Sequence, residues 1–144
     1  MRQARRTTSE PFRMDAGDVA PAANRELTLR PGEYEAGRFL ANHVQGGQGQ
    51  GYGGRLFITN ERLVFIPVAA SQSNGASRAE FDLPNVVAAE VAPRGTGPGI
   101  GSLRRRLRVR TVSGDVEYFV VWRPGKLAVF IDGLLHGVAV LRPA

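Results

Sequence analysis

From Glu26 onwards the sequence is a series of short strand-like runs divided by turn signals, and this series restricts the possible folds most. The runs are rich in Val, Leu, Ile and Phe and are bounded by Gly, Pro, Asn or Ser, which is typical of β-strands. Two polar turns, at residues 60–61 and 113–115, each separate two runs and predict two β-hairpins. The expected strands are residues 34–44, 55–59, 62–68, 80–83, 86–91, 103–112 and 116–123.

Only the last apolar segment has helical spacing. From Leu127 to Val138, apolar side chains recur at i, i+3, i+4, i+7, i+8 and i+11, which is one face of an α-helix. Pro124 stands where the first turn of a helix tolerates proline. Because about seven short strands cannot each bury a face in a flat sheet, we expect a rolled, mostly β barrel. A C-terminal helix, residues 125–138, then covers one of its open ends.

The expected core combines one face of each strand with the apolar face of the helix. The run 62–68 is unusual because it is apolar on both faces, with Val64, Ile66 and Val68 on the second one. A barrel wall meets water on one side, so this second face needs a cover from the helix edge, the N-terminal arm or another subunit. We therefore expect self-association or a stable complex. The side chains expected in the core are Leu56, Ile58, Leu63, Phe65, Leu107, Val109, Phe130, Ile131 and Leu134.

Length and composition favour one intracellular domain. The 144 residues include no cysteine, which excludes disulfide frameworks, thiol catalysis and thiolate metal sites and favours a cytoplasmic location. We expect no membrane-spanning helix and no secretory signal, because no apolar run is long enough. Residues 1–24 have few apolar groups and are expected to be a disordered or loosely docked arm, and residues 25–144 the folded domain. The preference for arginine over lysine is typical of a GC-rich bacterial genome.

The net charge of +6 is concentrated in two segments. Residues 1–14 carry +3 and residues 103–110 carry +5, so the remainder of the chain carries −2. Alternate side chains of an extended strand face opposite ways, so four arginines are expected on one outer face. We call this segment the arginine strand, and its four residues are Arg104, Arg106, Arg108 and Arg110.

Two interpretations of the arginine strand stay open. The first is a solvated face, partly neutralised by Glu117, which a Ser113-Gly114 turn would place opposite Arg110. The second is an anion-binding or partner-binding surface, because arginine binds phosphate and carboxylate groups through two hydrogen bonds. Its ligand would be a lipid headgroup, an acidic protein or a nucleic acid.

The sequence shows no catalytic constellation. Residues 49–54 match G-x-G-x-x-G, but a strand rather than a helix is expected to follow, which predicts a flexible loop between strands. His43 and His136 lack any metal-ligand spacing and are interpreted as surface or capping residues. Glu33 and Glu35 are interpreted as exposed carboxylates on one strand face. Because nothing assembles a nucleophile, a base and an orienting group, we expect no enzyme, no metal and no cofactor.

Residues 54–65 (GRLFITNERLVF) carry a family resemblance. This glycine, apolar strand, Thr-Asn turn, Arg-Leu pair and second apolar strand with Phe resemble the GRAM branch of the pleckstrin-homology-like superfamily. Residues 81–86 (FDLPNV) are similar to that family's Leu-x-x-Ile/Val step into the next strand. The resemblance covers roughly residues 25–140 and implies a PH-like split barrel, two near-orthogonal antiparallel sheets closed by the C-terminal helix. The implied role is a recognition scaffold for lipids or proteins.

The same resemblance bears on the partner. Phosphoinositide-binding pleckstrin-homology domains cluster basic residues around the first two strands and their loop. Here that loop is QGGQGQGYGG, flanked only by Arg38, His43 and Arg55, so we expect protein–protein interaction. The alternative is peripheral binding to anionic membrane through the arm and the arginine strand. Nucleic acid is disfavoured, because two of the three nearby aromatic side chains are expected to point inward. Those three are Tyr118, Phe119 and Trp122.

Overall fold

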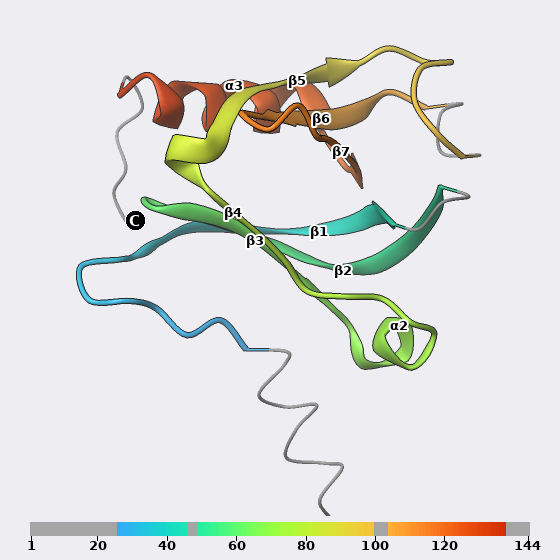
Figure 1. Ribbon diagram of the computed structural model, residues 1–144, viewed down its shortest axis with the longest axis horizontal. Helices are drawn as coiled ribbons and strands as arrows, with labels where there is room; N and C mark the ends of the chain where they lie inside the picture. Colours follow the sequence, from blue (N-terminus) through green and yellow to red (C-terminus); the bar gives the residue numbers. More distant parts are fainter. Residues whose placement is uncertain (1–25, 46–48, 100–103, 138–144) are drawn as a thin grey trace, which may run out of the picture.

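The computed structural model describes residues 26–45, 49–99 and 104–137 (Figure 1). The expected arm, residues 1–24, lies outside these ranges. The strands are β1 (Glu35–Gln45), β2 (Gln50–Thr59), β3 (Arg62–Pro67), β4 (Ala79–Asp82), β5 (Val86–Ala92), β6 (Arg106–Thr111) and β7 (Val116–Val121). The helices are α2 (Ala69–Ser73), the 3-10 turn η1 (Leu83–Asn85) and α3 (Pro124–Leu135).

The strand β1 joins two layers of one antiparallel sheet, whose order is β4-β3-β2-β1-β7-β6-β5. It pairs with β2 along its whole length but with β7 at only three positions, Ala41 to His43. On either side of these pairs the layers separate, with β1–β4 in one and β5–β7 in the other (Figure 1). The expected mostly β split barrel of seven antiparallel strands with a C-terminal helix is thereby confirmed.

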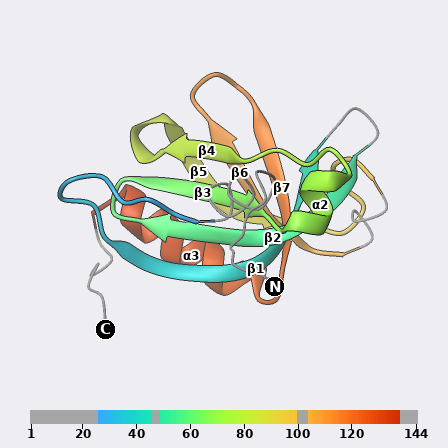
Figure 2. The same ribbon diagram turned by 90° about the horizontal axis from the view of Figure 1, so that it is seen from below.

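The core fills the space between the two layers, and α3 covers it. Leu127, Ile131 and Leu134 belong to the core cluster, and α3 packs mainly on β5 and also on β6. Figure 2 shows this helix behind the layer of β1, β2 and β3. Each such side chain contributes roughly 1.5–3 kcal/mol when it is fully buried. All the expected core residues are buried except Phe130, which is only partly buried.

Three segments differ from the sequence-based expectation by more than a small shift of a strand end. The glycine-rich segment is only partly a loop, because β2 begins at Gln50 and pairs its glycines with β1. The polar segment after β3 contains the short helix α2. The helix α3 ends at Leu135 rather than residue 138, and Gly137 has the left-handed φ of 68° that often ends a helix. None of the helices in the described ranges is long and apolar enough to cross a bilayer.

The outer face of β2 and β3 has a small apolar cluster of its own. Phe57, Val64 and Ile66 are buried there, and Leu27 from the segment ahead of β1 packs against them. The second apolar face of β3 was expected to need a cover from the helix edge, the N-terminal arm or another subunit. Instead, the segment 26–34 supplies part of that cover.

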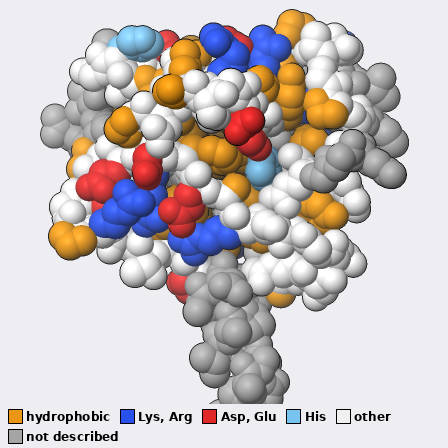
Figure 3. Space-filling view, viewed as in Figure 1, with side chains coloured by type: hydrophobic (Ala, Val, Ile, Leu, Met, Phe, Trp, Pro, Cys, Tyr) orange, Lys and Arg blue, Asp and Glu red, His pale blue; other side chains and the backbone are white. Residues whose placement is uncertain are grey.

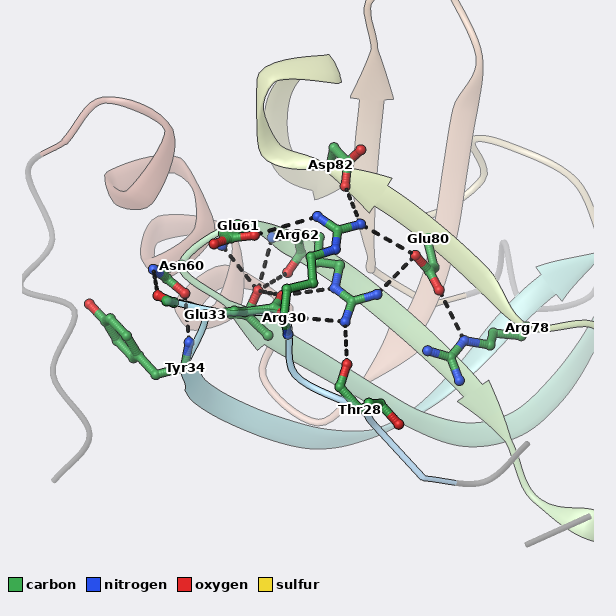
Figure 4. A network of polar contacts seen from close by, with 12 residues as sticks. Thr28, Arg30, Glu33, Tyr34, Asn60, Glu61, Arg62, Arg78, Glu80 and Asp82 are labelled. Carbon is green, nitrogen blue, oxygen red and sulfur yellow. Dashed lines mark hydrogen bonds and ion pairs between the residues drawn. The ribbon is translucent and has the colours of Figure 1, made fainter. Parts of the chain in front are cut away.

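A buried ion pair fastens the segment 26–34 to the barrel (Figure 4). The Nε and Nη2 atoms of Arg62 donate to the two carboxylate oxygens of Glu33, at 2.8 and 3.0 Å. The Thr59 hydroxyl donates to the same carboxylate at 2.6 Å. These hydrogen bonds, that from Arg62 above all, lower the pKa of Glu33 to about 2. The prediction of an exposed carboxylate was wrong for Glu33, because its partner lies 29 residues away in the sequence.

Candidate functional site

A groove opens where β1 and β7 separate beside the first turns of α3. Its volume is about 670 Å³, within the range of roughly 300–1,000 Å³ that is usual for ligand sites. The neighbouring sequence explains its position: β7 ends at Val121, and Pro124 then begins α3 at a position where proline needs no hydrogen-bond partner. The apolar side chains that line the groove are Phe39, Leu40, Val121, Trp122, Leu127 and Phe130.

Two of these apolar side chains are largely in solvent. Trp122 is 82% exposed and Leu40 is 73% exposed. The two are next to each other along the split, because Ala41 pairs with Val121 in an antiparallel ladder, and Leu40 precedes Ala41 just as Trp122 follows Val121. Large apolar side chains grouped around a hollow in this way mark binding surfaces.

The rim of the groove is basic. Arg123 and Lys126 line it and form no ion pair with any described residue, whereas Arg38 is held by Glu35 at 2.7 Å. No carboxylate lines the groove within the described ranges. An apolar surface with two unpaired cations at its edge is suited to a ligand that carries both apolar groups and negative charge.

None of the arginine-strand residues lines this groove. Arg106, the first residue of β6, is not exposed. Arg106 is fully buried, and its guanidinium lies 4.6 Å from the centre of the Tyr118 ring. It donates to the carbonyl oxygens of Pro98 at 2.9 Å and Thr96 at 2.8 Å. The prediction of four arginines on one exposed face was wrong for Arg106, because the loop after β5 folds over it.

The other arginines have different surroundings. Arg108 and Arg110 both donate to Glu90 on β5, at 2.8 and 3.0 Å, and these bonds lower the pKa of Glu90. Arg104 is exposed and precedes β6. The expected neutralising partner, Glu117, lies opposite Val109 rather than Arg110, because the hairpin turn is one residue longer than the Ser113-Gly114 turn allowed. Anion binding by these arginines stays a prediction.

His43 is a core residue, contrary to the prediction. Its ring is buried and stacks on Phe119 at 4.5 Å between ring centres. The Gln45 amide donates to its Nδ1 at 2.8 Å, so Nε2 carries the proton and donates to Glu117 at 2.7 Å. Both ring nitrogens are therefore occupied. His136, in contrast, is exposed at the end of α3, as expected of a capping residue.

A second hollow, about 570 Å³ in volume, is a weaker candidate. Arg30, Glu61 and Asp82 line it, and their charges satisfy one another: Arg30 lies 3.2 Å from Asp82 and 3.5 Å from Glu61. On the face seen in Figure 3, acidic and basic side chains lie close together around β3 and β4. Such paired charges stabilise the segment 26–34 and leave little unpaired charge to bind a ligand.

Sequence reasoning missed the groove. Two of the three aromatic side chains of the 116–123 strand were expected to point inward, whereas only Phe119 is buried and Trp122 is exposed. One signal was present: Trp122 and Lys126 are the chain's single tryptophan and single lysine, four residues apart. Their meeting with Leu40 depends on the β1–β7 pairing, which no local pattern indicates. Within the described ranges, no group of His, Asp and Glu is placed to hold a metal ion.

Comparison with known proteins identifies the class of fold. No family model matches the chain, and no curated protein does. The solved Vps36 N-terminal PH domain is 16% identical, with a TM-score of 0.56, covering 81% of this chain and 89% of its own. The C-terminal domain of an unknown protein from Leishmania infantum is 15% identical, with a TM-score of 0.54, covering 74% and 87%. The chain has a PH-like fold, whereas the GRAM branch and the bacterial origin remain predictions.

Proposed function

We propose that this chain is a non-catalytic binding module that engages a protein partner through the groove. The observation that carries the proposal is the exposed pair Leu40 and Trp122 beside the unpaired cations Arg123 and Lys126. Tryptophan and arginine are the residue types that most often dominate the energy of protein interfaces. The volume of the groove suits a few partner side chains rather than a flat contact.

The chemistry of the most enzyme-like pair supports a binding role. The His43 and Glu117 side chains form a short hydrogen bond, but Gln45 occupies the other ring nitrogen. A general base needs a free nitrogen within reach of the substrate proton. His43 is also stacked in the core, so its role is to fix β1 against β7 and the loop that Gln45 binds.

Family membership and location are part of the same proposal. In the structure, the GRAM-like segment 54–65 forms the second half of β2, the tight turn and the first four residues of β3. The Thr59 hydroxyl accepts hydrogen bonds from the backbone of Glu61 and Arg62, and the Asn60 side chain accepts one from Tyr34. These contacts give the Thr-Asn turn a structural reason, which supports assignment to the GRAM branch. The absence of cysteine fits a cytoplasmic location.

Peripheral binding to anionic membrane is the second candidate. Tryptophan with neighbouring cations also suits a membrane interface, and each cation near an anionic surface contributes about 1 kcal/mol. Co-sedimentation with phosphatidylserine-containing vesicles separates the two candidates. We expect the chain to stay in the supernatant at low salt. Salt-sensitive sedimentation that depends on Trp122 would replace the protein partner by a membrane.

The protein partner is tested through the groove itself. A photo-reactive side chain at position 40 captures what binds there, and the captured protein is then purified and titrated with the chain. The double variant Leu40→Ser/Trp122→Ser should weaken this complex ~30-fold or more, because even a single interface hot spot is worth about 2 kcal/mol or more. Val112→Ser, which changes a 66% exposed valine outside the groove, is the matched control. Equal affinity of the double variant would reject the groove as the site.

A further inference from the structure

The groove contains an unpaired length of sheet edge. On one side of β1, residues Gly37 to Leu40 pair in order with Ile58, Phe57, Leu56 and Arg55 of β2. On the other side, β7 reaches only Ala41, so within the described ranges no strand pairs with β1 ahead of that residue. Backbone N–H and C=O groups alternate along a strand between its two edges. The groove side of Gly37 to Leu40 therefore offers backbone partners to an incoming extended chain.

Each of the two rows of side chains beside this edge contains apolar residues, and the outer row also holds Arg38, which is paired with Glu35. Phe39 points to the core side, where Phe130 and Leu127 lie, and Leu40 points to the outer side with Trp122. An added strand also alternates its side chains between the two faces. Its inner row would meet Phe39 and Phe130 and its outer row would meet Leu40 and Trp122, so a segment with apolar residues at successive positions would bury apolar side chains on both faces. A helix would leave the β1 edge unused.

The positive charge at the rim of the groove favours a negatively charged partner segment. The groove has Arg123 and Lys126 at its rim, both without an ion-pair partner among the described residues, and no carboxylate lines it. Complementary charge raises the association rate and sets the orientation of a partner. A strand that carries Asp or Glu next to its apolar residues meets these cations, whereas a basic strand is repelled.

We propose that the partner contributes an extended, acidic and apolar segment that adds to β1 as a strand at Gly37 to Leu40. This inference rests on the proposed function and specifies how the groove is used. Main-chain hydrogen bonds to the open edge supply affinity, and the apolar side chains of the two rows and the basic rim supply specificity. The occupied length is short, because only Gly37 to Leu40 lie between the register shift near the start of β1 and the β7 pairing on this edge.

A peptide selection tests the mode of binding. A phage-displayed library of random short peptides is selected on the full chain and counter-selected on Leu40→Ser/Trp122→Ser. Trp122 is the only tryptophan, so its fluorescence reports directly on occupancy of the groove. We expect enriched peptides to combine Asp or Glu with consecutive apolar residues. N-methylation of alternate peptide residues should weaken binding ~10-fold for the set that faces β1 and little for the other set.

A charge reversal provides the second measurement. Arg123→Glu/Lys126→Glu should weaken the selected peptide ~10-fold and reduce the salt dependence of its binding. Arg94→Glu/Arg105→Glu changes the net charge equally at two exposed arginines outside the groove and should leave binding unchanged. Peptides with helical spacing, or peptides insensitive to both N-methylation sets, would overturn strand addition but keep the binding function. Failure to enrich any peptide that alters Trp122 fluorescence would overturn both.

Discussion

Buried charged side chains show how single residues fasten the outer parts of this fold. Arg62 is enclosed by the Glu33 carboxylate, a Glu80 carboxylate at 3.0 Å and the Thr28 carbonyl at 2.8 Å. Arg106 is instead enclosed by carbonyl oxygens and a tyrosine ring. Removing one partner of such a group leaves an unpaired charge in the interior, which costs more than the pair itself contributes. Each of these residues therefore holds a segment that has little core of its own.

The Glu33 carboxylate predicts a pH dependence of stability. Its pKa falls from the ordinary 4.5 to about 2 in the folded protein. Its contribution is therefore complete above the ordinary value and is lost as pH falls towards about 2. We expect Glu33 to account for up to about 3 kcal/mol of the loss in unfolding free energy between about pH 5 and pH 2. Urea unfolding of wild type and Glu33→Gln measures it, and an equal pH dependence in the two proteins would contradict the assignment.

At the scale of elements, the hairpin β2–β3 depends on a glycine without room for a side chain. A Cβ on Gly54 would collide with the Ile66 carbonyl oxygen and lie 2.7 Å from Pro67 Cα. At Gly51, by contrast, an added Cβ would touch only Asn42, at an ordinary 3.7 Å. The glycine-rich segment thus contains a position of close strand packing, Gly54, and a position of low constraint, Gly51.

Alanine substitution separates these two kinds of glycine. Gly54→Ala should lower the unfolding free energy by about 1–3 kcal/mol, because the obstructing atoms are backbone and cannot turn away. Gly51→Ala should change it by less than about 1 kcal/mol. Chemical denaturation of both variants provides the comparison. Equal costs would mean that the strands do not approach closely at Gly54.

At the scale of the whole molecule, the two layers are joined by only three residue pairs of β1 and β7, so their shared core, to which α3 contributes, carries much of the stability. Ile131 is fully buried in the core, whereas Val129 on the same helix is 74% exposed. Ile131→Ala should cost about 2–5 kcal/mol through lost burial and the cavity that remains. Val129→Ala should stay within about 0.5 kcal/mol. Similar melting temperatures for the two variants would show that α3 does not hold the layers together.

Self-association is also a property of the whole molecule, and it stays a prediction. Leu27 covers part of the cluster of Val64 and Ile66 from the same chain, and the ion pair of Glu33 with Arg62 fastens the segment that carries Leu27. Because this face is partly covered, it has less need of a second subunit to bury it. The groove, with Leu40 and Trp122, is an apolar surface that remains open.

Local patterns along the chain determined the number of strands, both hairpins, the position of α3 and nearly all of the core. These features follow from residue spacing, because a strand repeats every two residues and a helix every 3.6. The absence of cysteine and the charge distribution were likewise readable from the sequence. The register of the β6–β7 hairpin was not readable from the sequence. One additional residue in the 111–115 turn places Glu117 opposite Val109 rather than Arg110, and its carboxylate accepts a hydrogen bond from His43.

Only the tertiary structure decided what lies beside what. Glu33 meets Arg62, Arg106 meets the loop after β5, and Leu40 meets Trp122, and each pairing joins residues from different elements. Hydrophobic spacing specifies which face of an element is buried but not which distant side chain satisfies a buried charge. The groove arises in the same way. It is the place where β7 stops pairing with β1, and that stop depends on how two layers and a helix pack, not on any local run of residues.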